Sequence, residues 1–577
     1  MLNLQKANKL KDKILTSSLL KDAQLSIFVM GIAGCGLIYQ YLLASYSGRV
    51  IGVMEIAIFT IMTIMILCMG IGSFFVKKIK NKALGFSILE SLISIVAVSS
   101  IYIISGAHAL AYMLPEIIAQ QFNIPIEQAP KYGFVSVLED ILEYSSYIVA
   151  AILGFLLGME IPFLAAIREE VHGKHLDNNI GVIYGVDYFG AAIGATLWIM
   201  ILIGMDVAQS LQITSFVNVL VGFFFILSFK KYVKRCNLAL GVQIFTAFFI
   251  YFACQGITDW RKNLEQAFHR DPIVYSQNTK YQHFTVTEGR NSVSGEPIYS
   301  LYINKKTQFT SADESLYHSL LVYPTMIAAG EAKDVLIIGG GDGLALRDVL
   351  KFNPESVTIM DLDPALINFF KEPVYSEDGK FVNAQFIELN ENAFNDERVN
   401  FVFGDAFLHV RDYARQNKKF DAIIVDLPDP SHPDLNKLYS KTFYKELHHL
   451  LNFNGAISIQ SSSPQSSKEA FISIGKTLKS SGFHTQQYQR NIPSFNGQWG
   501  WTIGTKSLPM AKGRIASYEK LPVEDEWLTK SLLMATFEFG KNYYKNIDSI
   551  KVNTIDNNAT YNYYQNAWNE LERSVFE

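Results

Sequence analysis

Apolar residues are concentrated in the first 258 positions of the chain, where they form long runs with almost no charge. A helix that crosses a bilayer needs about 20 apolar residues, and seven segments reach that length. They run from Ala23 to Gly48, Ile56 to Val76, Ser91 to Pro115, 144 to 167, 178 to 205, Val207 to Phe229 and Cys236 to Thr258. We therefore predict a basic cytoplasmic tail over 1–22, followed by a transmembrane domain of about seven helices over 23–258.

The pattern changes after residue 258, because short apolar runs of strand length begin to alternate with segments of helical length. The sequence predicts strands at His283–Gly289 and Ile298–Phe309, with a turn at 291–295. Further buried strands are predicted at 335–339, 356–361, 399–404, 420–426 and 455–460. Strands that alternate with helices in this way indicate an α/β Rossmann-like, doubly wound parallel sheet.

The second half therefore divides into three parts. We predict a joining segment with a small β domain over 259–310 and a Rossmann-like domain over 311–505. Residues 506–577 form a C-terminal extension for which the sequence indicates no role.

Composition excludes a chain that is wholly soluble, fibrous or disordered. Hydrophobic residues make up 49% of the 577 residues and charged residues 18%, whereas soluble proteins carry about 25% charged residues. The net charge of −4 gives no sign of a nucleic-acid-binding surface. The four cysteines all lie within or beside apolar segments, which excludes a disulfide framework and zinc-ligand spacing.

Basic loops predict the orientation of the transmembrane domain, because lysine and arginine are enriched on the cytoplasmic side. Three clusters alternate correctly with the predicted helices: Lys6, Lys9, Lys11, Lys13 and Lys21; Lys77, Lys78, Lys80 and Lys82; and Lys230, Lys231, Lys234 and Arg235. The long connection 116–143 is acidic. With seven crossings, this orientation places residues 259–577 outside the cytoplasm.

Four acidic residues, Glu55, Glu90, Glu160 and Asp187, lie in or at the edge of the apolar segments. An ionisable group at membrane depth costs several kcal/mol and suggests a function. Two interpretations remain open. Each acid could accept a hydrogen bond between helices or lie at a helix end, or the acids could bind a cation.

Carboxylates follow four successive strands of the predicted sheet. A glycine turn, Gly339–Gly343, contains Asp342, and the next three strands end at Asp361, Asp405 and Asp426. Glycines allow a tight turn and a close approach of backbone to ligand, and ligands bind at the carboxyl ends of such strands. Acids that cap helices could explain one or two of these positions, but four in succession indicate a binding site.

With these motifs, the second half resembles the spermidine synthases, which are polyamine aminopropyltransferases, and the whole chain resembles their membrane-bound, multi-pass variety. The matches extend from about 276 to 505. In order, they are Tyr281-Gln282, Gln308, Asp313-Glu314, Tyr317-His318, Gly339–Gly343 with Arg347, Asp361 with Asp363, Asp405-Ala406, Asp426 to Pro433, Leu438-Tyr439, Phe443-Tyr444 and Trp499-Gly500. The chain departs from the family pattern at Asn304, Ser319, Leu344 and Asp361, so the specificity of the amine pocket stays open.

The resemblance implies transfer of an aminopropyl group from decarboxylated S-adenosylmethionine to a di- or polyamine, with methylthioadenosine as the second product. The donor is a co-substrate, and no tightly bound cofactor or metal is expected. An alkylammonium has a pKa of about 10, so the site must hold a cation and also remove its proton. We expect Asp426 to be this base.

The resemblance also assigns the remaining site residues. Asp429, His318 and Asp342 are expected to bind amino groups, Asp342 that of the donor. Gln282, Gly339, Gly341, Asp361, Asp405, Ala406 and Pro433 are expected to bind the methylthioadenosine portion.

Two other functions remain open: a methyltransferase that uses intact S-adenosylmethionine, and a polyamine transporter or sensor whose second half only binds. The expected partners are polyamines and the lipid bilayer, with no nucleic acid, and a homodimer is possible. Because the donor is made in the cytoplasm, we predict a multi-pass cell-membrane protein with a cytoplasmic catalytic domain. This prediction conflicts with the orientation that the basic loops favour.

Overall fold

The chain divides into two compact units, Met1–Arg270 and Asp271–Glu577, in the computed structural model. The structure describes residues 2–51, 54–122, 134–172, 178–375 and 379–576. The side chain of Glu55 and positions 123–133 of the acidic connection lie outside the described residues.

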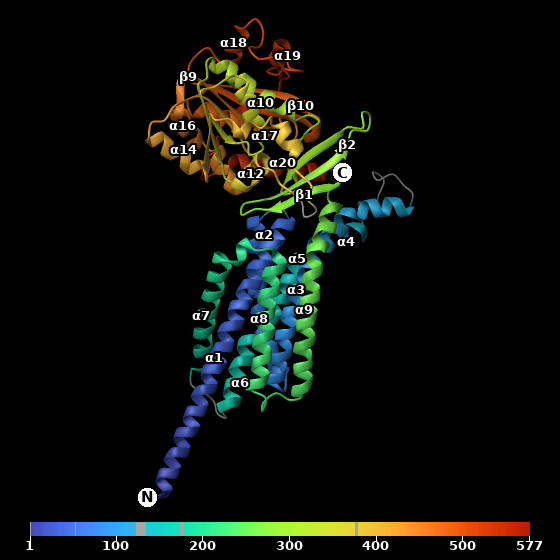
Figure 1. Ribbon diagram of the computed structural model, residues 1–577, viewed down its shortest axis with the longest axis vertical. Coiled ribbons are helices and arrows are strands. Elements are labelled where there is room, and N and C mark those ends of the chain that lie inside the picture. The colour runs from blue at the N-terminus through green and yellow to red at the C-terminus, as the bar shows by residue number, and fades with distance from the viewer. Residues whose placement is uncertain (1, 52–53, 123–133, 173–177, 376–378, 577) are drawn as a thin grey trace. The chain divides into compact units, whose positions relative to one another are not determined.

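The first unit is entirely helical, as its apolar pattern predicts (Figure 1). Among its described residues, seven helical stretches are long and apolar enough to cross a membrane, which confirms the predicted number. The fourth stretch consists of two successive helices. The helices are α1 (Leu2–Ile51), α2 (Met54–Ser73), α3 (Lys82–Phe122), α4 (Phe134–Glu143), α5 (Ser145–Leu157), α6 (Glu160–His172), α7 (Asn179–Met200), α8 (Val207–Ser228) and α9 (Cys236–Ala267).

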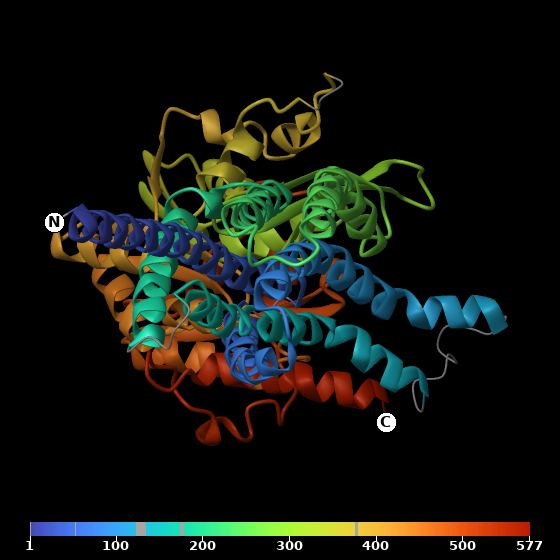
Figure 2. The same cartoon turned by 90° about the horizontal axis from the view of Figure 1, so that it is seen from below.

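Small residues let α1 and α7 pack closely, and Figure 2 shows the two helices side by side. A Cβ atom on Gly194 of α7 would lie 2.5 Å from the backbone oxygen of Gly34 in α1. Any larger side chain at Gly194 would therefore separate the helices. This is the kind of close contact for which glycine is used between apolar helices.

Contacts at the two ends of the first unit show which of its loops lie at the same end. The Tyr232 backbone oxygen accepts a hydrogen bond of 3.1 Å from Asn81 Nδ2, and Lys21 Nζ lies 5.6 Å from the centroid of the Tyr232 ring. The start of the first span and the two described basic loops thus share one end. At the other end, Arg261 of α9 forms a 2.9 Å ion pair with Asp206, just before α8.

The second unit contains two sheets. Four antiparallel strands, β1 (Ile273–Asn278), β2 (His283–Arg290), β3 (Pro297–Ile303) and β4 (Lys306–Thr310), form the smaller one in sequence order. The larger has the order β10-β11-β9-β8-β5-β6-β7. Its strands are β5 (Asp334–Gly339), β6 (Ser356–Asp361), β7 (Val399–Phe403), β8 (Phe420–Asp426), β9 (Leu451–Gln460), β10 (His484–Ile492) and β11 (Gly497–Thr505).

Strands β5 to β9 are parallel, which confirms the doubly wound α/β fold, while β10 and β11 form an antiparallel edge that we did not predict. Both faces of the sheet are buried. Val335 and Ile337 of β5 belong to the core on one face, and Leu336 and Ile338 to the core on the other. From β5 the chain adds β6 and β7 on one side of the sheet, and then β8 and β9 on the other side. The carboxyl ends of β5 and β8 therefore form the switch point where ligands bind in such folds.

One strand prediction was wrong. The predicted strand Ile298–Phe309 is two strands, β3 and β4, because Asn304 and Lys305 form a turn with φ angles of +49° and +67°. Tight hairpin turns require such positive φ values and usually carry glycine. Strand β1 also lies within the segment that we had treated as a joining region.

Helices cover the larger sheet on both faces (Figure 1). They are α10 (Glu314–Ala329), α11 (Leu344–Leu350), α12 (Pro364–Lys371), α13 (Ala384–Leu389), α14 (Ala406–Arg415), α15 (Pro433–Asn436), α16 (Lys441–Leu450), α17 (Lys468–Ser480), α18 (Ala511–Ala516), α19 (Lys530–Ala535) and α20 (Ala559–Phe576). Residues 506–577 belong to this unit. Asn553 Nδ2, for example, donates hydrogen bonds to the backbone oxygens of Asn436 (3.2 Å) and Tyr439 (3.0 Å).

Candidate active site

The glycine turn after β5 brings two strand ends into contact. Gly339 is the register partner of Asp426 at the end of β8. It has a φ of +84°, and a Cβ atom there would lie 2.0 Å from the Asp426 backbone oxygen. Only glycine fits this position. The turn then presents Asp342, whose Oδ1 accepts a 3.0 Å hydrogen bond from the Leu344 amide at the start of α11.

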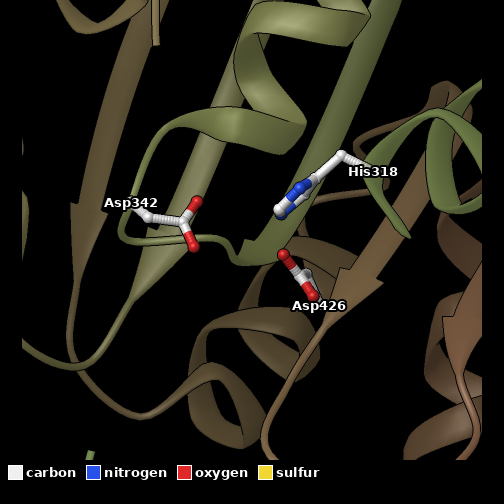
Figure 3. Close-up of side chains that lie close together, drawn as sticks. All are labelled: His318, Asp342 and Asp426. Carbon is white, nitrogen blue, oxygen red and sulfur yellow. The ribbon is translucent and has the colours of Figure 1, made fainter. Parts of the chain in front are cut away.

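Three predicted residues converge at this switch point. One ligand-type atom from each of His318, Asp342 and Asp426 lies within 4.8 Å of the other two. Figure 3 shows the three side chains pointing toward a common space from α10, the glycine turn and the end of β8. The Tyr317 hydroxyl donates a 2.7 Å hydrogen bond to Asp426 Oδ1. The site is therefore acidic and assembled from separate parts of the chain, with His318 buried and both aspartates half-buried.

A buried ion network holds His318 in its charged form. His318 Nδ1 lies 3.1 Å from Glu314 Oε2, and Arg347 binds both Glu314 carboxylate oxygens at 2.8 and 3.1 Å. Burial lowers the pKa of His318, but the hydrogen bond with Glu314 and the charge of Asp342 outweigh it and raise the pKa to about 9. Because Nδ1 is engaged by Glu314, Nε2 is the ring atom left to face the two aspartates.

The pKa of Asp426 is suited to accepting a proton near neutral pH. Burial and the charge of Asp342 raise this pKa, the charge of His318 and the hydrogen bond from Tyr317 oppose the rise, and the net pKa is about 6. Burial also raises the pKa of Asp342. A base works best when its pKa is close to the operating pH, and with a pKa of about 6 Asp426 is mainly deprotonated at neutral pH.

Asp429 belongs to a second group of polar side chains. Gln460 Nε2 donates a 2.9 Å hydrogen bond to Asp429 Oδ1. Burial raises the pKa of Tyr564 in α20, and the charge of Asp429 raises it further. The Lys306 Nζ atom lies 5.6 Å from the centroid of the Tyr564 ring, and the Asp429 charge opposes the fall in the Lys306 pKa that burial causes. An exposed lysine and a buried tyrosine therefore accompany this carboxylate.

Asp361 is the last residue of β6, so it lies at the same edge of the sheet as the central site, where the parallel strands have their carboxyl ends (the rim). A Cβ atom on Gly341 would be 3.1 Å from Asp361 Oδ2. Burial raises the pKa of Asp361 to about 7, and its Oδ1 accepts a 2.8 Å hydrogen bond from the Asp363 amide. Gln282, in the turn between β1 and β2, donates a 3.0 Å hydrogen bond to Asp363 Oδ2. Gln282 thus reaches the rim through Asp363.

The remaining predicted residues occupy the next two strand ends. Asp405, after β7, caps α14 through a 3.0 Å bond from the Phe407 amide and forms a 2.6 Å ion pair with Lys437. Ala406 is the first residue of α14, and Pro433 is the first of α15. These residues therefore lie beyond the carboxyl ends of β7 and β8, and none of them belongs to the central trio.

The sequence did not single out Lys306 or Tyr564. The altered residues near Asn304 were one signal, because they mark the turn that leads to Lys306. Tyr564 carried no signal, since it lies in the C-terminal extension and reaches the site only through folding.

The central trio also has the residue types that bind metal ions. A histidine that Glu314 keeps protonated has no lone pair to offer a metal. One imidazolium and two carboxylates carry a net charge of −1, and this charge matches a single organic ammonium ion.

Comparisons with known proteins agree with this chemistry. The family described as "Spermine/spermidine synthase domain" matches residues 314–512. A polyamine aminopropyltransferase of Shewanella oneidensis is 42% identical over 567 residues, which cover 97% of this chain and 98% of that protein. The chain belongs to the polyamine aminopropyltransferase family. Polyamine aminopropyltransferase 1 of Streptomyces coelicolor is 29% identical over 93% of each chain. A solved spermidine synthase from Thermotoga maritima is 22% identical with a TM-score of 0.39, and the match covers 48% of this chain and 88% of that chain.

As an aminopropyltransferase, the protein is a transferase with decarboxylated S-adenosylmethionine as co-substrate and no tightly bound cofactor. The region that matches the family domain contains His318, Asp342, Asp426 and Asp429. Lys306 and Tyr564 lie outside it, on either side.

Proposed function

We propose that this aminopropyltransferase is a membrane-bound enzyme that converts putrescine to spermidine. The observation that supports it best is the trio of Asp342, Asp426 and the buried His318 at the switch point of the sheet. The trio combines a base of suitable pKa with a negative charge for an ammonium ion.

In the proposed reaction, Asp426 accepts a proton from the bound ammonium group of the acceptor. The freed lone pair attacks the donor carbon that is bonded to the sulfonium sulfur. A carbon–nitrogen bond forms, the carbon–sulfur bond breaks, and methylthioadenosine leaves with the bonding electrons. Because the donor carries its own leaving group, Asp426 needs to act only as a base.

Asp342 is proposed to bind the aminopropyl ammonium of the donor. Its carboxylate would repel the carboxylate of intact S-adenosylmethionine, and such repulsion is an effective source of selectivity. Asp361 and Gln282 would orient the ribose portion, and Asp405 and Ala406 the adenine. Pro433 would lie against the nucleoside, and Gly339 and Gly341 would let the backbone approach it.

Asp429 and His318 are proposed to line the acceptor site together with Lys306 and the buried Tyr564. A lysine ammonium beside Asp429 repels further positive charge at that end of the site. This repulsion favours a short diamine over spermidine, which carries an additional ammonium group. Putrescine is the acceptor that we favour for this reason.

The first unit is proposed to lie in the cell membrane. Large apolar side chains, such as Phe59, Phe189 and Phe252, are 69%, 72% and 67% exposed on it. Apolar exposure on this scale is favourable in lipid and costly in water. We propose that the second unit faces the cytoplasm, where the donor is made, and that the enzyme is a homodimer.

Turnover of the purified full chain tests the proposal. Decarboxylated S-adenosylmethionine is supplied with putrescine, cadaverine, agmatine or spermidine, and products are separated by chromatography. We expect methylthioadenosine and spermidine, with the highest kcat/KM for putrescine. Turnover of intact S-adenosylmethionine with release of its demethylated product would instead indicate a methyltransferase. Amine binding without any turnover would indicate a transporter or sensor.

A further inference from the structure

Two acidic side chains lie buried in the helical unit with unpaired carboxylate oxygens. Glu90 of α3 is 0% exposed, and Glu160 at the start of α6 is 6% exposed. Among the described residues, nothing donates a hydrogen bond to either Glu90 carboxylate oxygen or to Glu160 Oε1. The two acids are close enough for their charges to interact, and Asp187 of α7 also interacts with Glu160.

The polar groups around Glu90 do not satisfy its carboxylate. Asn218 of α8 donates to the Glu90 backbone oxygen and to Ser94 Oγ, both at 3.2 Å. Gln243 of α9 donates to the Ser87 backbone oxygen at 2.7 Å, and its own Oε1 has no partner among the described residues. The Asn218 amide is engaged in these bonds, although it lies close enough to the Glu90 carboxylate to interact with it. Gln243 uses one of its two amide protons for Ser87.

The arginine ion pairs that the structure describes in this unit lie at its two ends. Arg168 pairs with Asp22 at 3.1 Å, and Arg261 pairs with Asp206 at 2.9 Å. No described lysine or arginine pairs with Glu90 or Glu160. An ionised carboxylate without partners in an apolar interior costs several kcal/mol, so a proton or a cation from outside the chain must neutralise it.

The unpaired atoms suit an ammonium group. An alkylammonium has three N–H donors and no acceptor, and this cluster offers three unpaired carboxylate oxygens on two acids. Ca²⁺ requires six to eight oxygen ligands, more than these carboxylates supply. We propose that Glu90 and Glu160 form a second amine-binding site, within the helical unit and separate from the catalytic site. Its ligand is a protonated primary amine, and a diamine can place one charge near each acid.

Equilibrium dialysis of the purified full chain with radiolabelled putrescine, in the absence of donor, tests the proposal. The unaltered chain should bind two amines per chain. The double variant Glu90→Gln/Glu160→Gln should bind one, and Asp429→Asn should bind one at the other site. Combining all three substitutions should abolish binding. Glu170→Gln serves as the control, because it makes the same change at an exposed position of α6 and should leave both sites intact.

Aminopropyl transfer by the double variant distinguishes loss of the second site from loss of folding, and it should stay within about twofold of the unaltered rate. A stoichiometry of one in the unaltered chain would overturn the proposal. So would a stoichiometry of two in the double variant. Displacement of the second amine by millimolar Na⁺ or Ca²⁺, but not by other amines, would also overturn it and indicate a metal site.

Discussion

His318 controls the chemistry of the site through its charge. The His318 cation opposes the rise that burial causes in the pKa of Asp426, and the net pKa is about 6. Asp426 can act as a base only when it is deprotonated, so kcat/KM should fall as pH decreases through this pKa. In His318→Gln the opposing charge is lost, and we expect the acidic limb of the pH profile to move to higher pH. His484→Gln, at an exposed position of β10, should leave the limb in place. An unshifted limb in His318→Gln would show that the imidazole has only a structural role.

Glu314 has a structural role as well as keeping His318 charged, because it pairs with Arg347 in the protein interior. The side chains of Arg347 and Glu314 are 8% and 5% exposed. Glu314→Gln leaves the buried guanidinium with Asp348 as its remaining counter-charge, at 3.0 Å, and removes the counter-charge of His318. Breaking this buried network should lower the free energy of unfolding by about 3–5 kcal/mol. Calorimetric melting of the full chain measures the effect on the second unit. The exposed pair Asp412–Arg415 provides the comparison, since Asp412→Asn should cost about 0–1 kcal/mol. Similar losses in the two variants would contradict this interpretation.

At the scale of elements, the sequence predicts buried parallel strands well and edge strands poorly. The predicted ranges 356–361 and 420–426 coincide with β6 and β8, because strands buried on both faces are continuous apolar runs. Strand β10 reads His-Thr-Gln-Gln-Tyr-Gln-Arg-Asn-Ile, and its polar residues give no such signal. The turn at Asn304-Lys305 lacks the usual glycine.

The same difference applies to the site. Strand-end acids are recognisable because their spacing follows the strands, so Asp342, Asp361, Asp405 and Asp426 were predicted. Tyr564 could not be predicted, because helix α20 returns to the site from 135 positions beyond Asp429. Contacts that depend on tertiary folding leave no local pattern.

Helix α20 should influence acceptor binding through Tyr564. Removing its hydroxyl in Tyr564→Phe takes away a polar group beside Asp429, and we expect KM for putrescine to rise about tenfold, or about 1.4 kcal/mol. KM for the donor should not change. Tyr563→Phe is the matched control on the same helix, because its hydroxyl accepts from the Lys551 amide at 3.2 Å instead. Equal changes in both KM values would show that Tyr564 acts only through folding.

For the whole molecule, the helical unit and the chemistry predict opposite orientations. The basic loops share one end of that unit, and seven crossings put the second unit on the other side of the membrane. The positive-inside rule then places the second unit outside the cytoplasm, whereas the supply of the donor requires it inside. We retain the cytoplasmic prediction. With seven crossings it places the basic loops and the N-terminal tail on the outer side, so it replaces the prediction of a cytoplasmic tail over 1–22.

Cysteine labelling tests this orientation after the four native cysteines, all in the first unit, are replaced. Single cysteines are introduced as Lys231→Cys in a basic loop and Val293→Cys in the hairpin between β2 and β3, where Val293 is 95% exposed. We expect a membrane-impermeant reagent to label Lys231→Cys and not Val293→Cys in cells with an intact membrane. The reverse pattern would place the catalytic unit outside. Labelling of both, or of neither, would contradict an odd number of crossings.

The central claim is that Asp426 is the base for aminopropyl transfer, and Asp426→Asn tests it most directly. Asparagine keeps the size of the side chain but cannot accept a proton. Single-turnover formation of methylthioadenosine is measured with saturating donor and putrescine, and donor affinity is measured by equilibrium binding. We predict a rate lower by about 10²–10⁴-fold, with donor affinity within about threefold of the unaltered chain. An unchanged rate in Asp426→Asn would contradict the account.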